Sequence, residues 1–443
     1  MNKMKPLAAA LVGLGSIGMV AAATADSTVD ARIQELERQL QELKSQVSAQ
    51  QQEITTNKTE MQAEIDEARP MAKGTKFTYG GYIQLDAISS DYSEGKPNNL
   101  IEDFYVPALV PVEPDSGNAD SYNSTNFSAK TSRFFFTTAT DTDAGLISTR
   151  IELDFMLSGS GDERISNSWN SRLRHAFVQW DYDKDSSILA GQSWTTFFNV
   201  AALPDLLDFV GPAGTIFVRQ PQIRWTMGGL QLALENPATR LNDASGSTIY
   251  DNGQQAPDVI ARYNGNMGDL SWSAAAMGRQ LRYENRSDGG AIEDDSDDQF
   301  GYALSFAGKW MLGKDDLRFM LNFGDALGRY MGLNAFNDGY VKADGSIETF
   351  DQWGGFVAYQ HYWSDRWRST FSVSAAGADN PGTNDFVGSD GLAKKYQSAH
   401  LNLSWLPAPK LAIGGELIFA SKELEDGRDG DMSRVQFSVK YGF

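Results

Sequence analysis

The sequence contains no cysteine among its 443 residues, which excludes disulfide scaffolds, cysteine-ligated zinc and thiol catalysis. Histidine is nearly as scarce, because the three residues His175, His361 and His400 are scattered and leave little for metal or general-base chemistry. Positive charge is in the minority, with 38 Lys and Arg against 58 Asp and Glu, for a net charge of -20. Binding to nucleic acid needs a basic face, so we exclude it.

Long apolar runs are also missing. No stretch of about 18 apolar residues follows the N-terminal segment, which excludes a helical membrane protein. Residues 1–25 have the pattern of a secretory signal peptide, with Lys3 and Lys5 before an apolar core and small residues before Asp26. A secreted chain without cysteine suits the periplasm or the outer membrane better than a disulfide-stapled extracellular role.

The segment 26–70 is predicted to form a periplasmic coiled coil. Between Val29 and Ala68 apolar residues recur every 3.5 positions on average, and no Gly or Pro occurs before Pro70. This period favours a helix that buries its apolar stripe against copies of itself. The alternative is a lone amphipathic helix, which would be only marginally stable with nothing to pack on. The heptads alone do not distinguish a dimer from a trimer.

From residue 71 to 443 the apolar period changes from 3.5 to 2, which indicates strands with one apolar and one polar face. Short connections alternate with loops of 11 or more residues, as in a barrel with short periplasmic turns and long external loops. We therefore predict an all-β, 16-stranded antiparallel outer-membrane β-barrel. Its strands are expected near residues 77–88, 130–139, 146–157, 171–182, 187–196, 219–226, 229–236, 257–264, 269–279, 299–310, 316–324, 351–362, 367–376, 396–405, 410–420 and 432–443.

Tryptophan placement supports this interpretation. Seven of the ten tryptophans lie within about four residues of a proposed short turn, where an indole belongs at a membrane interface. The final strand has apolar residues on one face and ends in Phe443, a pattern that resembles the signal recognised by barrel-insertion machinery. The seven tryptophans are Trp180, Trp225, Trp272, Trp310, Trp363, Trp367 and Trp405.

Residues of the opposite parity should face the lumen. Arginines in a pore favour anions through their field and their fork-shaped hydrogen bonding; alternatively, they only neutralise lumen acids. Parity places Arg172 and Arg174 on the lipid face unless a bulge intervenes. The predicted lumen residues are the basic Arg133, Arg150, Arg224, Arg262, Arg279, Arg318 and Arg368, and the acidic Asp86, Glu152, Asp154 and Asp258.

The third long loop, from Phe197 to Pro212, is too rich in Phe and Leu to lie comfortably in water. We expect it to fold against the inner wall and narrow the pore, bringing Asp205 and Asp208 into the constriction; packing against a neighbouring subunit is the competing explanation. The acidic run at residues 293–298 is expected to be a solvated loop, with cation binding as the alternative.

The order of these features resembles the DcaP-like porins, a group of trimeric outer-membrane porins. The resemblance rests on the leading coiled coil, the segments 74–86, 132–134, 174–177 and 191–192, and the terminal Phe443. It implies a homotrimer of 16-stranded barrels, a periplasmic coiled coil, a constricting third loop, and uptake of small anions, dicarboxylates in particular.

Passive diffusion of small anionic solutes through the outer membrane is therefore the leading functional hypothesis, with no cofactor and no catalysis. An outer-membrane lipase is disfavoured because no histidine pairs with a strained serine motif. A structural tether from the membrane to the cell wall through the coiled coil, and a general or phosphate-preferring porin, stay open. Expected partners are two further copies of the chain, outer-membrane lipid and lipopolysaccharide.

Overall fold

The computed structural model describes residue 34, residues 37–49, 51–52, 55–56 and 58, and residues 74–443 apart from 118, 158–166, 244–245, 252–255, 287–291, 343 and 383–386. The chain divides into two compact units, with the boundary between Lys73 and Gly74. The predicted signal peptide lies outside the described residues, as does much of segment 26–70. The prediction of a loop at residues 293–298 is wrong, because this run belongs to the strand Ile292–Leu312, which pairs with the preceding strand as far as Ile292.

The described part of the N-terminal unit, between residues 34 and 58, is helical. Its apolar side chains Leu40, Leu43 and Val47 are exposed in the single chain. Arg38 and Glu42 form an ion pair of 3.7 Å one helical turn apart. None of the described helices is long and apolar enough to cross a membrane. Assembly of this helix into a coiled coil stays a prediction.

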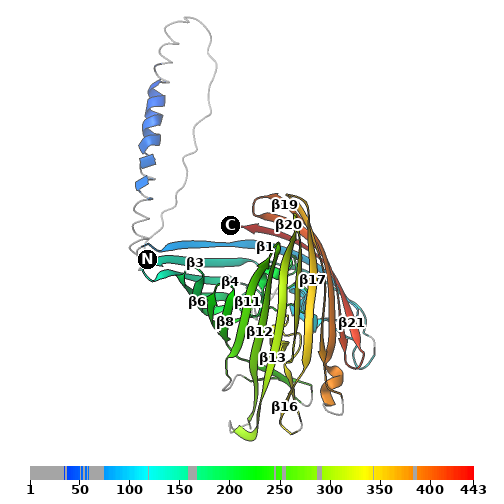
Figure 1. Ribbon diagram of the computed structural model, residues 1–443. Coiled ribbons are helices and arrows are strands. Elements are labelled where there is room, and N and C mark those ends of the chain that lie inside the picture. The colour runs from blue at the N-terminus through cyan, green and yellow to red at the C-terminus, as the bar shows by residue number, and fades with distance from the viewer. Residues whose placement is uncertain are drawn as a thin grey trace. The chain divides into compact units, whose positions relative to one another are not determined.

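Residues 74–443 form a closed barrel of 16 antiparallel strands, which confirms the predicted fold. β1 pairs with β3 on one side and with the last strand, β21, on the other, so the sheet returns to its first strand. Figure 1 shows the turn between β19 and β20 near the C-terminus and the long loops around β16 at the far end. The barrel strands are β1 (Lys76–Tyr92), β3 (Arg133–Thr142), β4 (Gly145–Asp154), β5 (Arg172–Asp183), β6 (Ser186–Trp194), β7 (Arg219–Met227), β8 (Leu230–Glu235), β11 (Asp258–Met267), β12 (Leu270–Arg286), β13 (Ile292–Leu312), β14 (Asp315–Gly324), β17 (Asp351–Ser364), β18 (Trp367–Asp379), β19 (Ala393–Ala408), β20 (Leu411–Leu424) and β21 (Asp429–Gly442).

Smaller elements belong to the long loops. β2 (Tyr122–Ser128) pairs with the C-terminal half of β1, and β3 pairs with its N-terminal half. β2 and β3 therefore act as one strand that is interrupted at residues 129–132. A four-stranded sheet lies apart from the barrel wall. Its strands are β9 (Thr239–Asn242), β10 (Thr248–Asp251), β15 (Gly339–Val341) and β16 (Ile347–Thr349), and the short helices are α2 (Asn99–Asp103), η1 (Pro107–Leu109), η2 (Val200–Ala202), η3 (Gly328–Tyr330) and η4 (Val387–Gly391).

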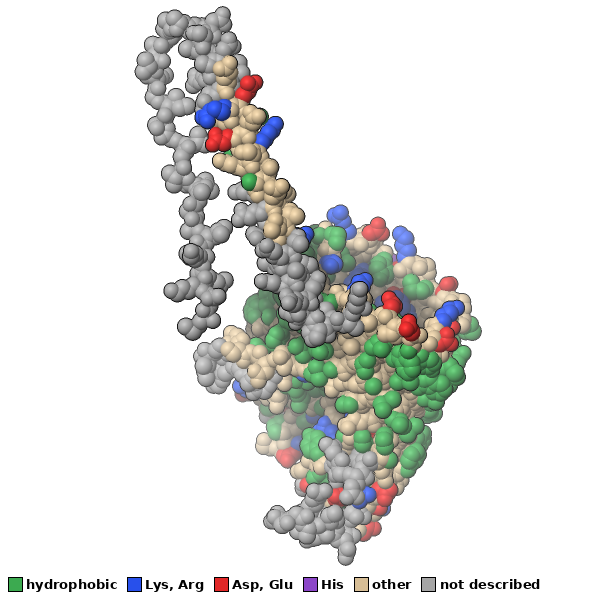
Figure 2. All heavy atoms as spheres, turned by 90° about the vertical axis from the view of Figure 1, so that its left-hand side faces the viewer, with side chains coloured by type: hydrophobic (Ala, Val, Ile, Leu, Met, Phe, Trp, Pro, Cys, Tyr) green, Lys and Arg blue, Asp and Glu red, His purple; other side chains and the backbone are tan. Residues whose placement is uncertain are grey.

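The outside of the barrel is apolar. Along β14, for example, Leu321 and Phe323 are exposed whereas Asn322 is buried inside the barrel. Figure 2 shows hydrophobic side chains gathered over the barrel surface, with charged side chains towards its two ends. Trp225 donates a hydrogen bond of 2.7 Å to the Tyr182 hydroxyl, and Trp367 stacks on Trp405. Six tryptophans near short turns are exposed: Trp180, Trp225, Trp310, Trp363, Trp367 and Trp405.

The largest apolar core lies inside the barrel, where residues of the loops pack against inward-facing residues of the strands. Three segments contribute to it: the first loop (residues 93–121), the third loop (residues 195–218) and the sixth loop (residues 325–350). Phe104 of the first loop packs on Phe209 of the third, with ring centres 5.6 Å apart. Ile216 of the third loop forms an isolated β-bridge with Met331 of the sixth. The lumen is therefore filled in part by loops that touch one another.

Candidate functional site

A cluster of charged side chains covers the inner wall at β3, β4 and β5. Glu152 and Asp154 follow the inward parity of β4, and Arg174 of β5 bridges them, with Nε 2.8 Å from Glu152 and Nη1 2.7 Å from Asp154. Arg172 binds Asp154 in a fork, with two hydrogen bonds of 2.9 Å. Such two-point guanidinium–carboxylate pairs fix geometry as well as charge.

Two further arginines complete this β3–β5 cluster. Arg133 lies 3.4 Å from Glu152, and Arg150 also pairs with Glu152. Four guanidinium groups thus share two carboxylates, so the cluster carries excess positive charge. Arg150 keeps 32% of its side chain exposed, the largest fraction in the cluster. The structure therefore brings together four of the predicted lumen residues: Arg133, Arg150, Glu152 and Asp154.

A β-bulge explains why Arg172 and Arg174 belong to the cluster. Glu152 pairs with His175 but the next residue, Leu153, pairs with Leu173, which leaves Arg174 as the extra residue. A bulge of this kind re-aims a side chain, so both arginines reach the inward carboxylates. Strict alternation would have placed both arginines on the lipid face, and the bulge turns them to the lumen.

Arg219 of β7 lies beside the cluster and was not selected from the sequence. Its guanidinium carbon is 4.3 Å from the centre of the Trp194 ring, and its Nη1 has no hydrogen-bond partner in the described part of the chain. Arg219 has the same parity along β7 as the exposed Ile223 and Trp225. Strict alternation therefore predicts that its side chain faces lipid and not the lumen. The cation–π contact with Trp194 holds the Arg219 guanidinium in position beside the cluster.

The other predicted arginines have separate environments. Arg224 makes no ion pair with a described residue. Arg262 donates to the backbone oxygens of Thr196 and Phe198 at 3.2 and 2.6 Å. Arg318 pairs with Asp316 and donates to the Leu203 oxygen at 2.6 Å. Arg262 and Arg318 thus bind backbone oxygens of the third loop.

Arg279 is enclosed rather than open to the lumen. It pairs with Asp258 at 3.2 Å and with Asp338 of the sixth loop at 2.8 Å, and none of the three side chains is exposed. Asp258 also accepts a hydrogen bond of 2.7 Å from the Tyr330 hydroxyl. Asp86 is likewise buried and accepts hydrogen bonds from neutral side chains, among them Thr131 at 3.0 Å.

The third loop crosses the lumen and is held by the opposite wall. The backbone N–H of Leu207 donates to Glu416 of β20, and the Ala213 N–H donates to Ser398 of β19 at 3.2 Å. Asn322 of β14 donates to the Gly214 oxygen at 2.9 Å. Strands distant in the chain therefore fix this loop across the barrel.

Asp208 organises the loop from within. Its carboxylate accepts hydrogen bonds from the N–H groups of Tyr105, Val210 and Gly211 at 2.8, 3.1 and 2.9 Å, so it joins the first loop to the third. Burial raises the pKa of the Asp208 carboxyl above its ordinary value, while His400, Arg434 and the backbone N–H groups act in the opposite direction. Asp208 is a structural anchor of the third loop.

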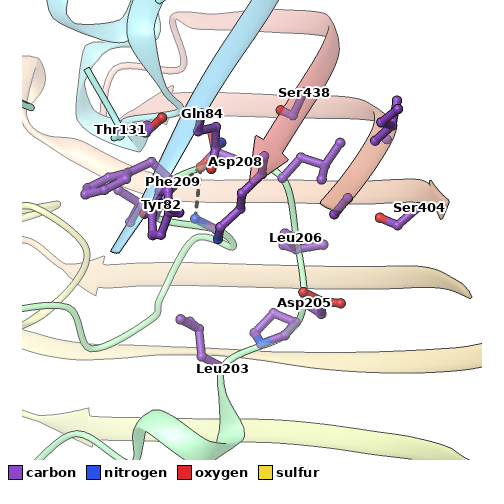
Figure 3. A pocket seen from close by; sticks show the side chains of 18 of the residues that line it. Tyr82, Gln84, Thr131, Leu203, Asp205, Leu206, Asp208, Phe209, Ser404 and Ser438 are labelled. Atoms are coloured by element: carbon purple, nitrogen blue, oxygen red, sulfur yellow. Dashed lines mark hydrogen bonds between the residues drawn. The ribbon is translucent and has the colours of Figure 1, made fainter. Parts of the chain in front are cut away.

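A cavity of about 240 Å³ lies between the third loop and the barrel wall, toward the end that carries the short turns. Figure 3 shows Asp205 and Asp208 on the loop, with Tyr82 of β1 and Ser438 of β21 on the Asp208 side of the cavity. Three cations line it, namely Arg133, Arg368 and Lys440.

This architecture, a closed 16-stranded barrel with an apolar exterior and charged side chains in its lumen, defines an outer-membrane channel of the porin type. Residues 17–443 match the model of the DcaP outer membrane protein family. The chain belongs to that family, and it is a porin of the bacterial outer membrane.

One solved structure in particular agrees on the fold. The outer membrane channel DcaP of Acinetobacter baumannii superposes with a TM-score of 0.66 at 21% identity, covering 84% of this chain and 99% of that one. OmpF of Salmonella typhi in complex with daunomycin has a TM-score of 0.49 at 12% identity, covering 84% and 98%. No curated protein matches the chain.

Proposed function

We propose that this porin mediates passive diffusion of small anionic solutes, dicarboxylates in particular. The observation that carries the proposal is the β3–β5 cluster, where four arginines share Glu152 and Asp154. Uncompensated guanidinium groups on the wall of a narrow lumen favour anions and repel cations. Arg224 and Lys440, which form no ion pair with a described residue, add to this bias.

The third loop is the constriction in this proposal. Its hydrogen bonds to Glu416 and Ser398, on the wall opposite β6 and β7, support a position across the lumen. A loop that is fixed at several points narrows the pore permanently and does not open and close as a lid would. Solutes would then pass the basic β3–β5 cluster on one side and the acidic loop residue Asp205 on the other.

Assembly is proposed as a homotrimer in the outer membrane, with segment 26–70 as a coiled coil in the periplasm. The exposed Leu40, Leu43 and Val47 would pack between the three helices. Contact of the coiled coil with the cell wall is a further proposed role, and outer-membrane lipid and lipopolysaccharide would surround the barrel.

Ion selectivity in planar bilayers tests the proposal. A salt gradient across the membrane should give a reversal potential of the sign that anion preference demands, and succinate should reduce the chloride current more than phosphate at equal concentration. A cation-selective pore would contradict anion preference, and stronger inhibition by phosphate would favour a phosphate-preferring porin. Absence of any conductance would favour the structural tether.

A further inference from the structure

The cavity beneath the third loop contains an ion pair that is partly exposed and poorly aligned. Arg368 of β18 lies 2.7 Å from Asp205, measured from Nε to Oδ2, with 26% and 39% of the two side chains exposed. The Nε–H group of Arg368 is not directed at that oxygen, so Nε has no hydrogen-bond partner among the described residues. Partly exposed pairs of this kind are weak, so a competing carboxylate can replace Asp205.

Asp205 reaches this position because the loop is tied beside it. Its Oδ2 accepts a hydrogen bond of 2.8 Å from Gln360 of β17, and its backbone oxygen accepts one of 2.8 Å from Asn402 of β19. The Asn402 bond holds the backbone independently of Arg368, whereas Gln360 binds the same carboxylate oxygen that faces Arg368. The Asp205 side chain can therefore leave the guanidinium without release of the loop.

A second positive site lies across the same cavity. Lys440 of β21 places its ammonium 4.0 Å from the centre of the Tyr82 ring, and the guanidinium carbon of Arg133 lies 5.2 Å from that ring. No carboxylate of the described residues is within ion-pair distance of Lys440. Tyr82 thus adjoins two cations, of which one has no counter-ion.

We propose that this cavity is a binding site for a short dicarboxylate and that Asp205 is its resident competitor. One carboxylate of the solute replaces Asp205 at Arg368, and the other is neutralised by Lys440 and Arg133. Water takes about 30 Å³ per molecule in the liquid, so a cavity of about 240 Å³ has room for a short dicarboxylate in place of several waters.

The competition has a consequence for transport. A solute that must displace a protein carboxylate binds more weakly than it would to free cations, and it leaves again as Asp205 returns. Conduction requires binding that is favourable enough to enter but weak enough to leave. The inference rests on the proposed anion preference and adds to it a specific site and a specific competitor.

The test measures succinate inhibition of chloride current in planar bilayers with the full-length protein. Asp205→Asn should lower the half-inhibitory succinate concentration by roughly fivefold, a change equivalent to about 1 kcal/mol, and Arg368→Gln should raise it. Asp365→Asn is the matched control, because Asp365 is an exposed acid on the adjacent turn and does not line the cavity. It should leave the concentration unchanged.

A double-mutant cycle separates competition from a general field effect. If Asp205 competes for Arg368, Asp205→Asn should have no effect in the Arg368→Gln background. An equal gain in both backgrounds would overturn the inference, and so would an unchanged or higher concentration in Asp205→Asn alone. A wild-type pore that is cation-selective and insensitive to succinate would instead overturn the proposed function. Heat-modified mobility on semi-native gels should match that of the wild type, which checks that each variant still folds.

Discussion

Arg279 of β12 and Asp338 of the sixth loop form an ion pair of 2.8 Å in which neither side chain is exposed to solvent. Asp338 also accepts a hydrogen bond of 3.2 Å from the Arg240 N–H, so one carboxylate joins two loops to the wall. Arg434 of β21 does the same for the first loop, with hydrogen bonds to Ser90 at 2.8 Å and to the Ile101 oxygen. Two fully buried arginines thus hold loops inside the barrel.

Arg279→Gln should destabilise the protein strongly, because it leaves Asp338 buried without its cation and Asp258 with only Arg329, at 3.5 Å. Removing one partner of a buried pair costs about 3–5 kcal/mol. The temperature at which the folded band is lost on semi-native gels should therefore fall. Lys394→Gln is the control, since Lys394 and Glu423 form an exposed pair of 3.6 Å and such pairs contribute about 1 kcal/mol at most. Equal melting of both variants would contradict the anchoring role.

Replacing Arg133 and Arg150 together by Gln should lower the anion-to-cation permeability ratio. The two substitutions remove the excess positive charge of the β3–β5 cluster while Arg172 and Arg174 still neutralise Glu152 and Asp154. The effect should be largest in dilute salt, because the Debye length is about 10 Å at 0.1 M. Reversal potentials provide the measurement. Glu152→Gln should raise the anion-to-cation permeability ratio. If none of the three substitutions changes this ratio, the cluster does not face the ion path through the pore.

Deletion of residues 203–209 should raise single-channel conductance, because this segment lies across the lumen and carries one of the contacts to the opposite wall, from Leu207 to Glu416. Glu416→Gln should have a smaller effect of the same sign, since it weakens the acceptor of the Leu207 N–H group. Recordings in KCl measure both. Unchanged conductance together with weaker trimers would place the loop at the subunit interface instead.

Deletion of residues 26–68 should leave a folded barrel, because the strands satisfy their own backbone groups by closure. β1 and β21 pair over 11 positions from Tyr82 to Tyr92, which closes the barrel. Insertion into liposomes and heat-modified mobility on gels report the outcome. Failure of the shortened chain to insert would show that the two units do not fold independently.

The strands could be predicted because lipid imposes a period of two on the outside of a barrel. Leu321 and Phe323 must face lipid, which leaves Asn322 for the lumen, and the same logic located all sixteen strands. Wherever the alternation is interrupted, the prediction weakens. At Arg174 a single extra residue reverses the side-chain direction, and no pattern in the sequence announces that bulge.

The lumen contacts were harder to predict because they join residues far apart in the chain. Arg279 was expected in the pore from its parity, but its partner Asp338 lies 59 residues later in a loop of mixed polarity. The third loop stood out through its Phe and Leu content. The first and sixth loops did not, although Tyr105 and Tyr330 are completely buried, because a few large side chains among polar neighbours give no periodic signal.

The packing of loops into the core inside the barrel has an evolutionary consequence. Surface loops usually tolerate insertions and substitutions, and a protein on the cell surface uses that freedom to escape phages and antibodies. Here a changed length in the first or sixth loop would withdraw Tyr105 or Tyr330 from the core, and the resulting cavity would cost stability. Sequence variation should therefore be concentrated on loop surfaces that do not contact this core. The inward-folded segments should change slowly, although they begin and end at the rim of the barrel.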